Sequence, residues 1–332
     1  MIKIGIMGFG HIGRYIYSKM DKNPNFKVNA ICDIGNPNIL KYLLESENRN
    51  NCKINYKDNY FITNSGKTRF INAVSPGDIP WDILNVDWVI DASGKYLSKN
   101  LLFKHIMAGA KKVILTTLPE DEIDNIIIPG INENSIKIND IIISAGSSTT
   151  NAMAILLKIF DEEFGIDYAN LMTIHSYTSE QPLQDMAGSD YRRSRSAAEN
   201  IIPNSNKSAE IIQKIMPKFN NKIMSSALNV PVQFGSMLDL TTVFNNSKVT
   251  KEKINDTLIK SSVNNPKLIK CVKDPIVSSD VIGMSETVVF DLKGTLKVGD
   301  NMIKTLSWYD NGFNHASRII DVISLYDKLE VV

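Results

Sequence analysis

A short glycine-rich stretch near the start of the chain could hold a phosphorylated cofactor. Gly8-Phe9-Gly10-His11-Ile12-Gly13 follows the apolar run Lys3–Met7 and precedes a helical pattern, and Asp33 stands 20 residues after Gly13. Glycines in this setting let the backbone turn tightly and approach a pyrophosphate, while the later carboxylate accepts ribose hydroxyls. The carboxylate would repel a 2′-phosphate, so the pattern predicts an NAD site rather than an NADP site. A glycine-rich turn without a ligand is the plainer alternative.

A second stretch combines hydroxyl groups with an imidazole. The cluster Ser147-Ser148-Thr149-Thr150 follows the apolar run Asp140–Ser144 and precedes the helical pattern Ala152–Glu163. His175 follows another apolar run. Taken alone, the cluster is typical of a helix N-cap and the histidine of a buried core residue. Taken together, a hydroxyl and an imidazole could catalyse proton transfer on a small substrate.

The elements that must position these residues change character along the chain. In the first half, apolar strands such as Val28–Cys32 and Lys112–Thr116 alternate with helical patterns. This alternation predicts a doubly wound parallel sheet, the Rossmann arrangement. After about residue 165, strand candidates surround a long polar stretch, Ser176–Ser208, whose basic residues are equally compatible with a solvated surface. The last helical pattern, Ala316–Leu329, is expected to pack on the first domain.

Composition excludes several classes of protein. The 332 residues include 37 Lys and Arg against 36 Asp and Glu, a net charge of +1, which argues against nucleic-acid or membrane binding. No apolar run reaches the roughly 18 to 20 residues of a membrane span, and the chain enters a folded motif at once, so we expect no signal peptide. The 3 cysteines (Cys32, Cys52 and Cys271) are scattered, which predicts neither a disulfide framework nor a zinc site and fits a reducing cytoplasm.

Longer stretches carry a family resemblance. They are IGIMGFGHIGR, IPWDILNVDWVIDASGKY, AGAKKVILT, SSTTN, LMTIHSYT, YRRSRSAAENIIP, NVPV and LSWYDN. In order and over the whole chain, they resemble the glyceraldehyde-3-phosphate dehydrogenase family. The resemblance implies a cytoplasmic homotetramer with NAD as cofactor and no metal. It implies an α/β fold in which a Rossmann domain (1–149, joined by a returning C-terminal helix, 314–332) precedes an α+β catalytic domain (150–313) with a mostly antiparallel sheet.

The resemblance also assigns roles to individual positions. His175 matches the general base, and Asn311 matches the residue that binds the nicotinamide carboxamide. Ala92-Ser93-Gly94 matches a segment along the cofactor, and Ser176–Asn200 matches a loop that lines the neighbouring subunit's cofactor site. The cofactor-binding candidates are therefore Gly8, Phe9, Gly10, His11, Ile12, Gly13, Asp33, Gly94, Thr117 and Asn311. The substrate-binding candidates are Ser147, Thr149, Thr178, Arg195, Lys207 and Asn229.

The catalytic position departs from the family pattern. The family has a cysteine nucleophile in Ser-Asn-Ala-Ser-Cys-Thr-Thr-Asn, where this chain has Ser144-Ala145-Gly146-Ser147-Ser148-Thr149-Thr150-Asn151. Ser148 thus replaces the thiol. A helix N-terminus and an imidazole can ionise a thiol of pKa about 8.5, but a serine needs a positioned base and usually an orienting group. We find no carboxylate in the matched motifs that would orient His175, so the thioester route is expected to be crippled or absent.

The phosphate-binding positions depart as well. The family's Pro-Thr-Ser-Thr-Gly-Ala-Ala-Lys is here Pro203-Asn204-Ser205-Asn206-Lys207-Ser208-Ala209-Glu210, and its Arg-Val-Pro is Asn229-Val230-Pro231. Thr178 and Arg195 keep their family identities. Asparagine does not replace a bidentate arginine, and Lys207 could supply only a flexible point charge or lie plainly at the surface.

Four functions remain compatible with the sequence. We expect an NAD-dependent oxidoreductase that transfers hydride with a small aldehyde or hydroxy substrate, with Ser148 and His175 as catalytic residues and no cysteine thioester. Alternatives are an ordinary phosphorylating glyceraldehyde-3-phosphate dehydrogenase inactivated by a Cys-to-Ser substitution, and a non-catalytic NAD-binding sensor or scaffold. A Ser148–His175 hydrolase is weaker because it lacks a carboxylate orienter.

Overall fold

The computed structural model describes residues 1–47, 54–179, 181–188, 190–245 and 248–330. Cys52 therefore lies outside the described residues. Contacts divide the chain into two compact units, which we describe separately. Unit 1 comprises Met1–Ser147 and Ala316–Val332, and unit 2 comprises Ser148–His315.

Unit 1 is built on a largely parallel sheet. Within the described residues the strand order is β3-β4-β5-β2-β1-β6-β7-β9-β8, and every neighbouring pair from β5 to β8 is parallel. The strands are β1 (Ile2–Met7), β2 (Phe26–Cys32), β3 (Asn55–Lys57), β4 (Tyr60–Thr63), β5 (Gly66–Ile71), β6 (Trp88–Asp91), β7 (Lys112–Leu115), β8 (Asn125–Ile126) and β9 (Ile142–Ser144). The doubly wound fold predicted from the alternating pattern is confirmed.

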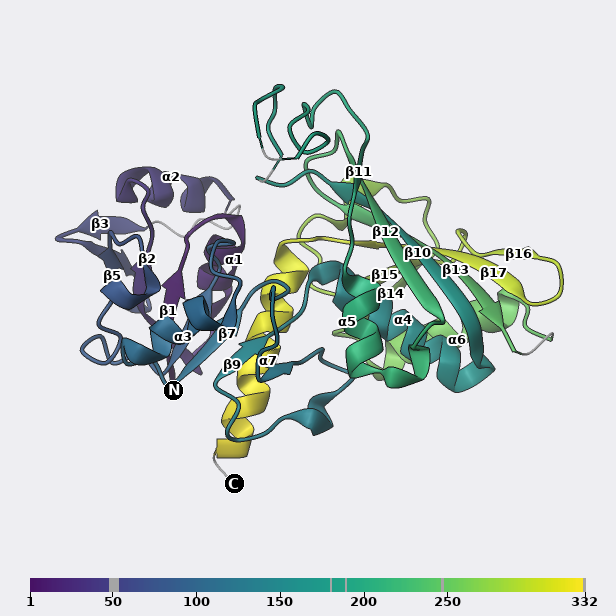
Figure 1. Cartoon of the computed structure of the whole chain (residues 1–332), viewed down its shortest axis with the longest axis horizontal. Coiled ribbons are helices and arrows are strands. Elements are labelled where there is room, and N and C mark those ends of the chain that lie inside the picture. The colour runs from purple at the N-terminus through teal and green to yellow at the C-terminus, as the bar shows by residue number, and fades with distance from the viewer. Residues whose placement is uncertain (48–53, 180, 189, 246–247, 331–332) are drawn as a thin grey trace. The chain divides into compact units, whose positions relative to one another are not determined.

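Helices and their apolar faces complete this unit. They are α1 (His11–Met20), α2 (Pro37–Glu47), α3 (Lys99–Met107) and most of α7 (Phe313–Glu330). Apolar residues of β1, β6 and α7 belong to one buried cluster, in which the rings of Trp88 and Tyr326 lie 5.6 Å apart. The C-terminal segment therefore shares a core with the first strands of the chain (Figure 1).

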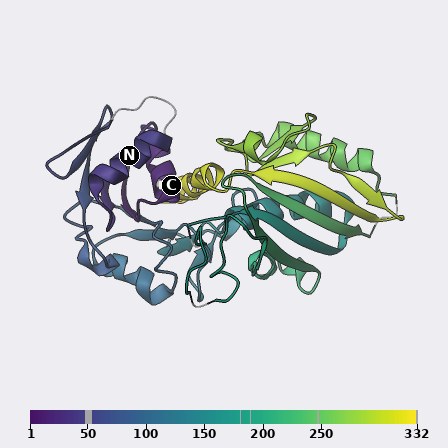
Figure 2. The ribbon, with the colours of Figure 1, turned by 90° about the horizontal axis from the view of Figure 1, so that it is seen from above.

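Unit 2 is built on a mixed, mostly antiparallel sheet. Its strand order within the described residues is β11-β12-β10-β13-β17-β15-β14, with β16 paired to β17. The strands are β10 (Ile166–Ser176), β11 (Ile202–Asn204), β12 (Ile223–Val230), β13 (Ser236–Phe244), β14 (Ile269–Val272), β15 (Val288–Asp291), β16 (Leu296–Val298) and β17 (Met302–Tyr309). The helices α4 (Ser148–Phe164), α5 (Ser208–Ile215) and α6 (Lys251–Asn264) contact these strands. Figure 2 shows the long strands running side by side.

The start of α4 matters for the chemistry. The sequence pattern placed the helix at Ala152–Glu163, with the hydroxyl cluster before it, but α4 begins at Ser148. The expected start was wrong because Ser148, Thr149 and Thr150 are buried against the unit, and packing outweighs their weak helix propensity. Ser148 is thus in the first turn of a helix, where backbone N–H groups lack intrahelical acceptors.

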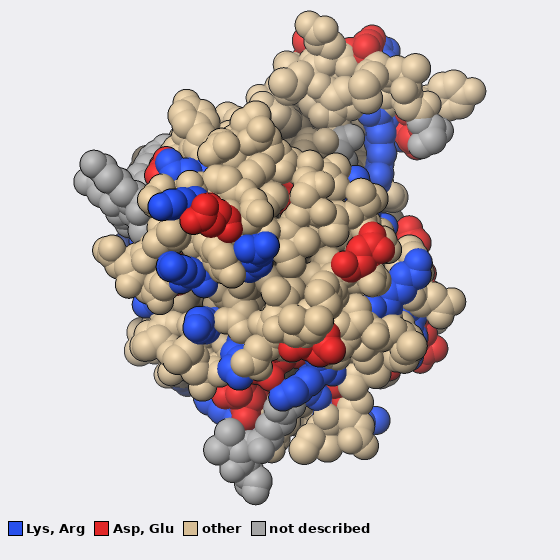
Figure 3. Space-filling model, turned by 90° about the vertical axis from the view of Figure 1, so that its left-hand side faces the viewer, with Lys and Arg blue, Asp and Glu red and all other residues tan. Residues whose placement is uncertain are grey.

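The surface charge and the free thiols agree with the composition. On the face shown in Figure 3, basic and acidic side chains are interspersed. Among the described residues, no helix has both the length and the hydropathy that crossing a bilayer requires. Cys32 and Cys271 are free thiols. Burial raises the pKa of the Cys32 thiol to about 12.

Candidate active site

The glycines of the β1–α1 loop are required by close backbone approaches. Gly8 has φ +91°, and a Cβ there would lie 2.6 Å from the backbone of Ser93. A Cβ on Gly13 would lie 2.2 Å from the carbonyl oxygen of Gly8. By contrast, a Cβ on Gly10 would meet no atom within 4 Å. Gly8 and Gly13 therefore serve the fold itself, whereas the space beside Gly10 is open to a ligand.

The start of α1 has the features of an anion site. Its N-cap is Gly10, which has no side chain to cap the first turn. The carboxylate of Asp33 lies next to this loop, with Oδ2 2.6 Å from the Phe9 backbone nitrogen and Oδ1 2.7 Å from that of Gly35. The open space, the helix start without a side-chain cap and the carboxylate together fit the pyrophosphate and ribose of a dinucleotide.

An ion pair between Arg14 and Glu47 also contacts this loop. Arg14 donates from Nη1 to the Phe9 carbonyl at 3.0 Å and from Nε to Glu47 at 2.8 Å. His11 Nδ1 lies 3.3 Å from the Glu47 carboxylate. Partial burial alone would raise the pKa of Glu47, but Arg14 and His11 lower it below its ordinary value. Ile12, the remaining residue of the motif, packs against the core cluster.

A buried hydrogen-bond chain supports the segment that contains Gly94. Trp81 Nε1 donates to His105 Nδ1 at 3.1 Å, so the proton of the neutral ring lies on Nε2, which is 3.2 Å from Asp91 Oδ2. The other oxygen of Asp91 accepts the backbone N–H and the hydroxyl of Ser93 at 3.0 and 2.6 Å. Trp81, His105 and Asp91 are each 0% exposed. This chain fixes the turn into Gly94, which has φ +67°.

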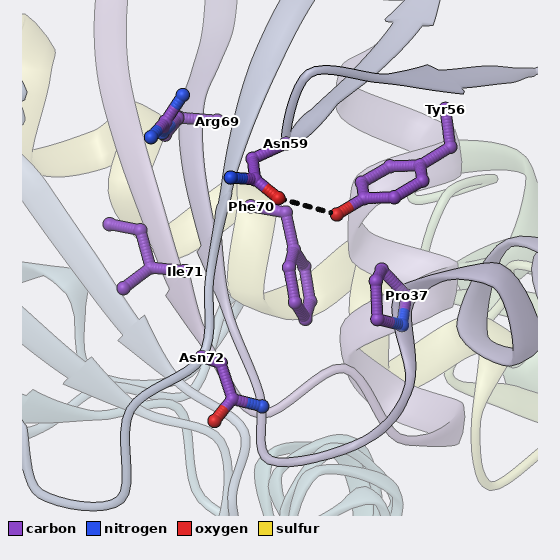
Figure 4. Close-up of a pocket in the computed structure, with 7 residues that line it drawn as sticks. All are labelled: Pro37, Tyr56, Asn59, Arg69, Phe70, Ile71 and Asn72. Carbon is purple, nitrogen blue, oxygen red and sulfur yellow. Dashed lines mark hydrogen bonds between the residues drawn. The ribbon is translucent and has the colours of Figure 1, made fainter.

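Two further features lie at the carboxyl edge of this sheet. The hydroxyl of Ser144 donates to the carbonyl of Thr117 at 2.6 Å, which ties the Thr117 loop to β9. Near the end of β5, a hollow of about 380 Å³ is lined by Pro37, Tyr56, Asn59, Arg69, Phe70, Ile71 and Asn72 (Figure 4). Asn72 donates to the Asp33 carbonyl at 3.3 Å, so the hollow neighbours the end of β2.

Two alanine substitutions should separate the fold from cofactor binding in this loop. Gly10→Ala is expected to change the free energy of unfolding by less than about 0.5 kcal/mol, because its Cβ meets open space. The same change should weaken NAD binding at least about tenfold by blocking approach of the pyrophosphate. Gly13→Ala should reduce both stability and NAD binding. Its Cβ would lie 2.2 Å from the Gly8 carbonyl oxygen, which should destabilise the fold by about 1–3 kcal/mol. Urea unfolding and calorimetric NAD titration measure the two quantities, and unweakened NAD binding by Gly10→Ala would contradict this assignment.

In unit 2, the first turn of α4 carries buried hydroxyl groups beside a buried phenol. Thr149 Oγ1 lies 2.6 Å from Tyr309 Oη, and Ser148 and Ser236 also hydrogen-bond this phenol. Ser148 is 8% exposed and Tyr309 0%. Burial raises the pKa of Tyr309 to about 12 despite these hydrogen bonds. The phenol therefore keeps its proton over the usual assay range.

His175 is oriented by a backbone carbonyl. It lies near the end of β10, and its Nδ1 is 2.6 Å from the carbonyl oxygen of Ser176. A carbonyl only accepts hydrogen bonds, so Nδ1 carries the proton and Nε2 is the basic nitrogen of the neutral ring. The imidazole also lies edge-on to Tyr309, with ring centroids 6.3 Å apart. The orienter that sequence motifs did not reveal is thus the main chain of the next residue.

Of the remaining candidate site residues, two lie beside the end of β10 and two are paired with other side chains. Asn311 accepts a hydrogen bond from the Ser176 hydroxyl at 3.1 Å, and Asn229 is paired with His175 across β10 and β12. Thr178 is hydrogen-bonded to Gln181 at 2.7 and 3.1 Å. Arg195 forms an exposed ion pair with Asp185 at 2.9 Å.

Two candidates flank helix starts. Ser147 is the last residue of unit 1 before α4. Lys207 is an exposed N-cap of α5 whose side chain makes no cap hydrogen bond. Among the described residues, no cluster of His, Cys, Asp and Glu is arranged to hold a metal ion.

Comparison with known proteins identifies the family. The sequence model described as "Glyceraldehyde 3-phosphate dehydrogenase, NAD binding domain" matches residues 2–99, and that described as "Glyceraldehyde 3-phosphate dehydrogenase, C-terminal domain" matches residues 147–311. The chain belongs to the glyceraldehyde 3-phosphate dehydrogenase family. It is therefore an NAD-dependent oxidoreductase by family, and the predictions of family, fold and cofactor are confirmed.

Individual relatives agree over nearly their whole length. The glyceraldehyde-3-phosphate dehydrogenase of Borreliella burgdorferi is 36% identical, covering 97% of this chain and 98% of the relative. Glyceraldehyde-3-phosphate dehydrogenase 1 of Bacillus subtilis is 33% identical, covering 98% of each. The Thermotoga maritima enzyme is 35% identical, covering 99% of this chain and 100% of the relative.

Proposed function

We propose that this member of the glyceraldehyde 3-phosphate dehydrogenase family transfers hydride between NAD and a small aldehyde or hydroxy compound without a covalent acyl-enzyme. The observation that carries the proposal is the combination of Ser148, at the start of α4, with a His175 whose Nδ1 donates to the Ser176 carbonyl. This arrangement supplies a basic Nε2 and a hydroxyl donor. It contains no thiol to form a thioester.

We assign the cofactor to loop and edge residues of unit 1 and to one residue of unit 2, Asn311. The loop of Gly8, Phe9, Gly10, His11, Ile12 and Gly13 would present its backbone at Gly10 to the pyrophosphate, while Gly8 and Gly13 shape the turn. Asp33 would bind the ribose, and Gly94, Thr117 and Asn311 would bind the rest of the cofactor. NAD supplies the hydride acceptor, or NADH the donor, when bound. The start of α1, which has no side-chain cap, and the open space at Gly10 support this assignment.

The chemical step then requires the protein only to accept one proton in oxidation and to return it in reduction. When a hydroxy compound is oxidised, His175 Nε2 accepts the hydroxyl proton as the carbon gives up a hydride and the C=O bond forms. The Ser148 hydroxyl and the backbone N–H groups at the start of α4 donate hydrogen bonds to the reacting oxygen. In the reverse direction His175 returns the proton.

The substrate side favours a group without a phosphate. Asn206 and Asn229 offer neutral amides, and Arg195 already pairs with Asp185 at 2.9 Å. The remaining candidate substrate contacts are Ser147, Thr149, Thr178 and Lys207. We further propose that the protein is a cytoplasmic homotetramer, with the domain boundary after residue 149.

A panel of paired compounds tests this function. Each non-phosphorylated aldehyde, sugar or polyol is assayed beside its phosphate ester for NAD reduction or NADH oxidation. We expect turnover with at least one non-phosphorylated compound and a lower kcat/KM for its phosphate ester. Turnover only with glyceraldehyde 3-phosphate and inorganic phosphate would favour an ordinary member of the family, whereas NAD binding without turnover would favour a sensor or scaffold.

A further inference from the structure

Three side chains connect a cation to the carbonyl that orients His175. Arg193 donates from Nε and Nη2 to Asn204 Oδ1 at 3.1 and 2.7 Å. Asn204 Nδ2 donates to Asn229 Oδ1 at 2.9 Å, and Asn229 Nδ2 donates to the Ser176 carbonyl at 3.4 Å. We call Arg193, Asn204 and Asn229 the amide relay.

Each link of the amide relay has only one possible direction. A guanidinium only donates, so the oxygen of Asn204 faces Arg193 and its NH2 group faces Asn229. Asn229 then accepts with its oxygen and must donate with its nitrogen, and the Ser176 carbonyl can only accept. Either end alone fixes the orientation of both amides, because Arg193 can only donate and the Ser176 carbonyl can only accept.

Strand pairing places the relay beside His175. Asn229 lies opposite His175 in the parallel β10–β12 pair, and β11, which carries Asn204, is antiparallel to β12. Asn229 is 5% exposed, so loss of a hydrogen-bond partner would leave a buried polar group unsatisfied. The chain thus fixes this amide within hydrogen-bond reach of the carbonyl that also binds the imidazole.

Within the part of the chain that the structure describes, the Ser176 carbonyl accepts hydrogen bonds from His175 Nδ1 and from Asn229 Nδ2. Imidazolium is a stronger donor than neutral imidazole, so it gains more from an uncontested acceptor. A second donor on that oxygen reduces this gain, and the positive charge at the far end of the relay polarises the amides in the same direction. We propose that the amide relay holds His175 as the neutral Nδ1–H tautomer, with Nε2 ready to accept a proton.

Ionisable groups on β13 and β17, the strands that follow β10 in the sheet, already have partners or keep their protons. On β17, Tyr309 has a pKa raised by burial to about 12, and the next residue, Asp310, accepts backbone N–H groups of Gly283, Gly312 and Phe313. On β13, Asp239 pairs with Lys304 at 2.6 Å, opposite Met172. The catalytic role of the amide relay rests on the proposed function. Its hydrogen-bond geometry does not, because no substrate takes part in it.

The test measures the ionisation of His175 without turnover. Diethyl pyrocarbonate acylates the neutral Nε2 of histidine and releases ethanol and carbon dioxide, and peptide mass spectrometry gives the rate at His175 as a function of pH. In Asn229→Leu, which keeps the volume but removes the amide, we expect the midpoint of this curve to rise by about half a pH unit. In Asn204→Ala, which breaks the relay one step earlier, we expect a smaller rise.

Asn301 provides a matched control for the loss of a side-chain amide. Asn301→Leu removes an amide that donates to the Phe244 carbonyl at 2.7 Å, outside the relay, and should leave the midpoint unchanged. An unchanged or lowered midpoint in Asn229→Leu would overturn the relay, and if that variant does not fold, Asn204→Ala decides by the same criterion. Because acylation needs no substrate, failure of the relay and failure of the proposed oxidoreductase activity are distinguishable.

Discussion

Replacing His175 by alanine will lower turnover about a thousandfold or more, whereas Ser148→Ala will lower it at most about a hundredfold. The first change removes the only base that the proposal uses, a loss typical of general acid–base catalysis. The second removes one hydrogen-bond donor to the reacting oxygen and leaves the start of α4 in place. Steady-state kinetics with the best compound of the panel measures both values of kcat.

The size of the Ser148 effect separates two mechanisms. If Ser148 were a covalent nucleophile, its removal would cost on the order of a millionfold, as in serine hydrolases. Thr149→Val is a suitable control, because it removes a hydroxyl bound to Tyr309 at 2.6 Å while Ser148 remains. Equal, near-complete losses in Ser148→Ala and His175→Ala would contradict the non-covalent route.

Introducing a thiol at the same position, Ser148→Cys, will create a highly reactive cysteine. The start of α4 and the imidazole of His175 both favour the thiolate, and only the thiolate reacts with iodoacetamide. The native Cys32 is a contrasting internal reference, since burial raises its pKa to about 12. At pH 7 we expect position 148 to be alkylated at least about a hundredfold faster than Cys32, as followed by peptide mass spectrometry.

Ser148→Cys also tests whether the missing thiol is the only difference that prevents phosphorylating activity. Adding His175→Ala should slow alkylation at position 148, which isolates the contribution of the imidazole. Ser148→Cys should still show little phosphorylating activity, because Asn206, Lys207 and Asn229 remain. Full phosphorylating activity from this one substitution would mean that the chain is an ordinary member of its family with a substituted nucleophile.

The parts of the site that the sequence predicts are those governed by local geometry. Gly8 and Gly13 stand where a Cβ would meet backbone at 2.6 and 2.2 Å, so residue type alone indicated the turn. Asp33 follows a strand at a spacing set by one βαβ unit. These features depend on neighbouring residues and on the length of one helix.

The unpredicted parts depend on backbone acceptors or on distant segments. The orienter of His175 is the Ser176 carbonyl, and every residue has a carbonyl, so residue type gives no signal. Asn204 meets Asn229 only because β11 and β12 pair. The chain from Trp81 through His105 to Asp91 likewise joins separate elements. Tyr309 lay within the matched stretch LSWYDN, and that stretch was the available signal for it.

Hydride transfer without an acyl-enzyme at Ser148 can be tested on the unmodified protein. The most direct measurement is to quench wild-type enzyme in acid during steady-state oxidation of the best aldehyde of the panel and to weigh the peptide that contains Ser148. We expect NADH to form while that peptide keeps its unmodified mass. Accumulation of a substrate-derived acyl group on Ser148 would contradict it.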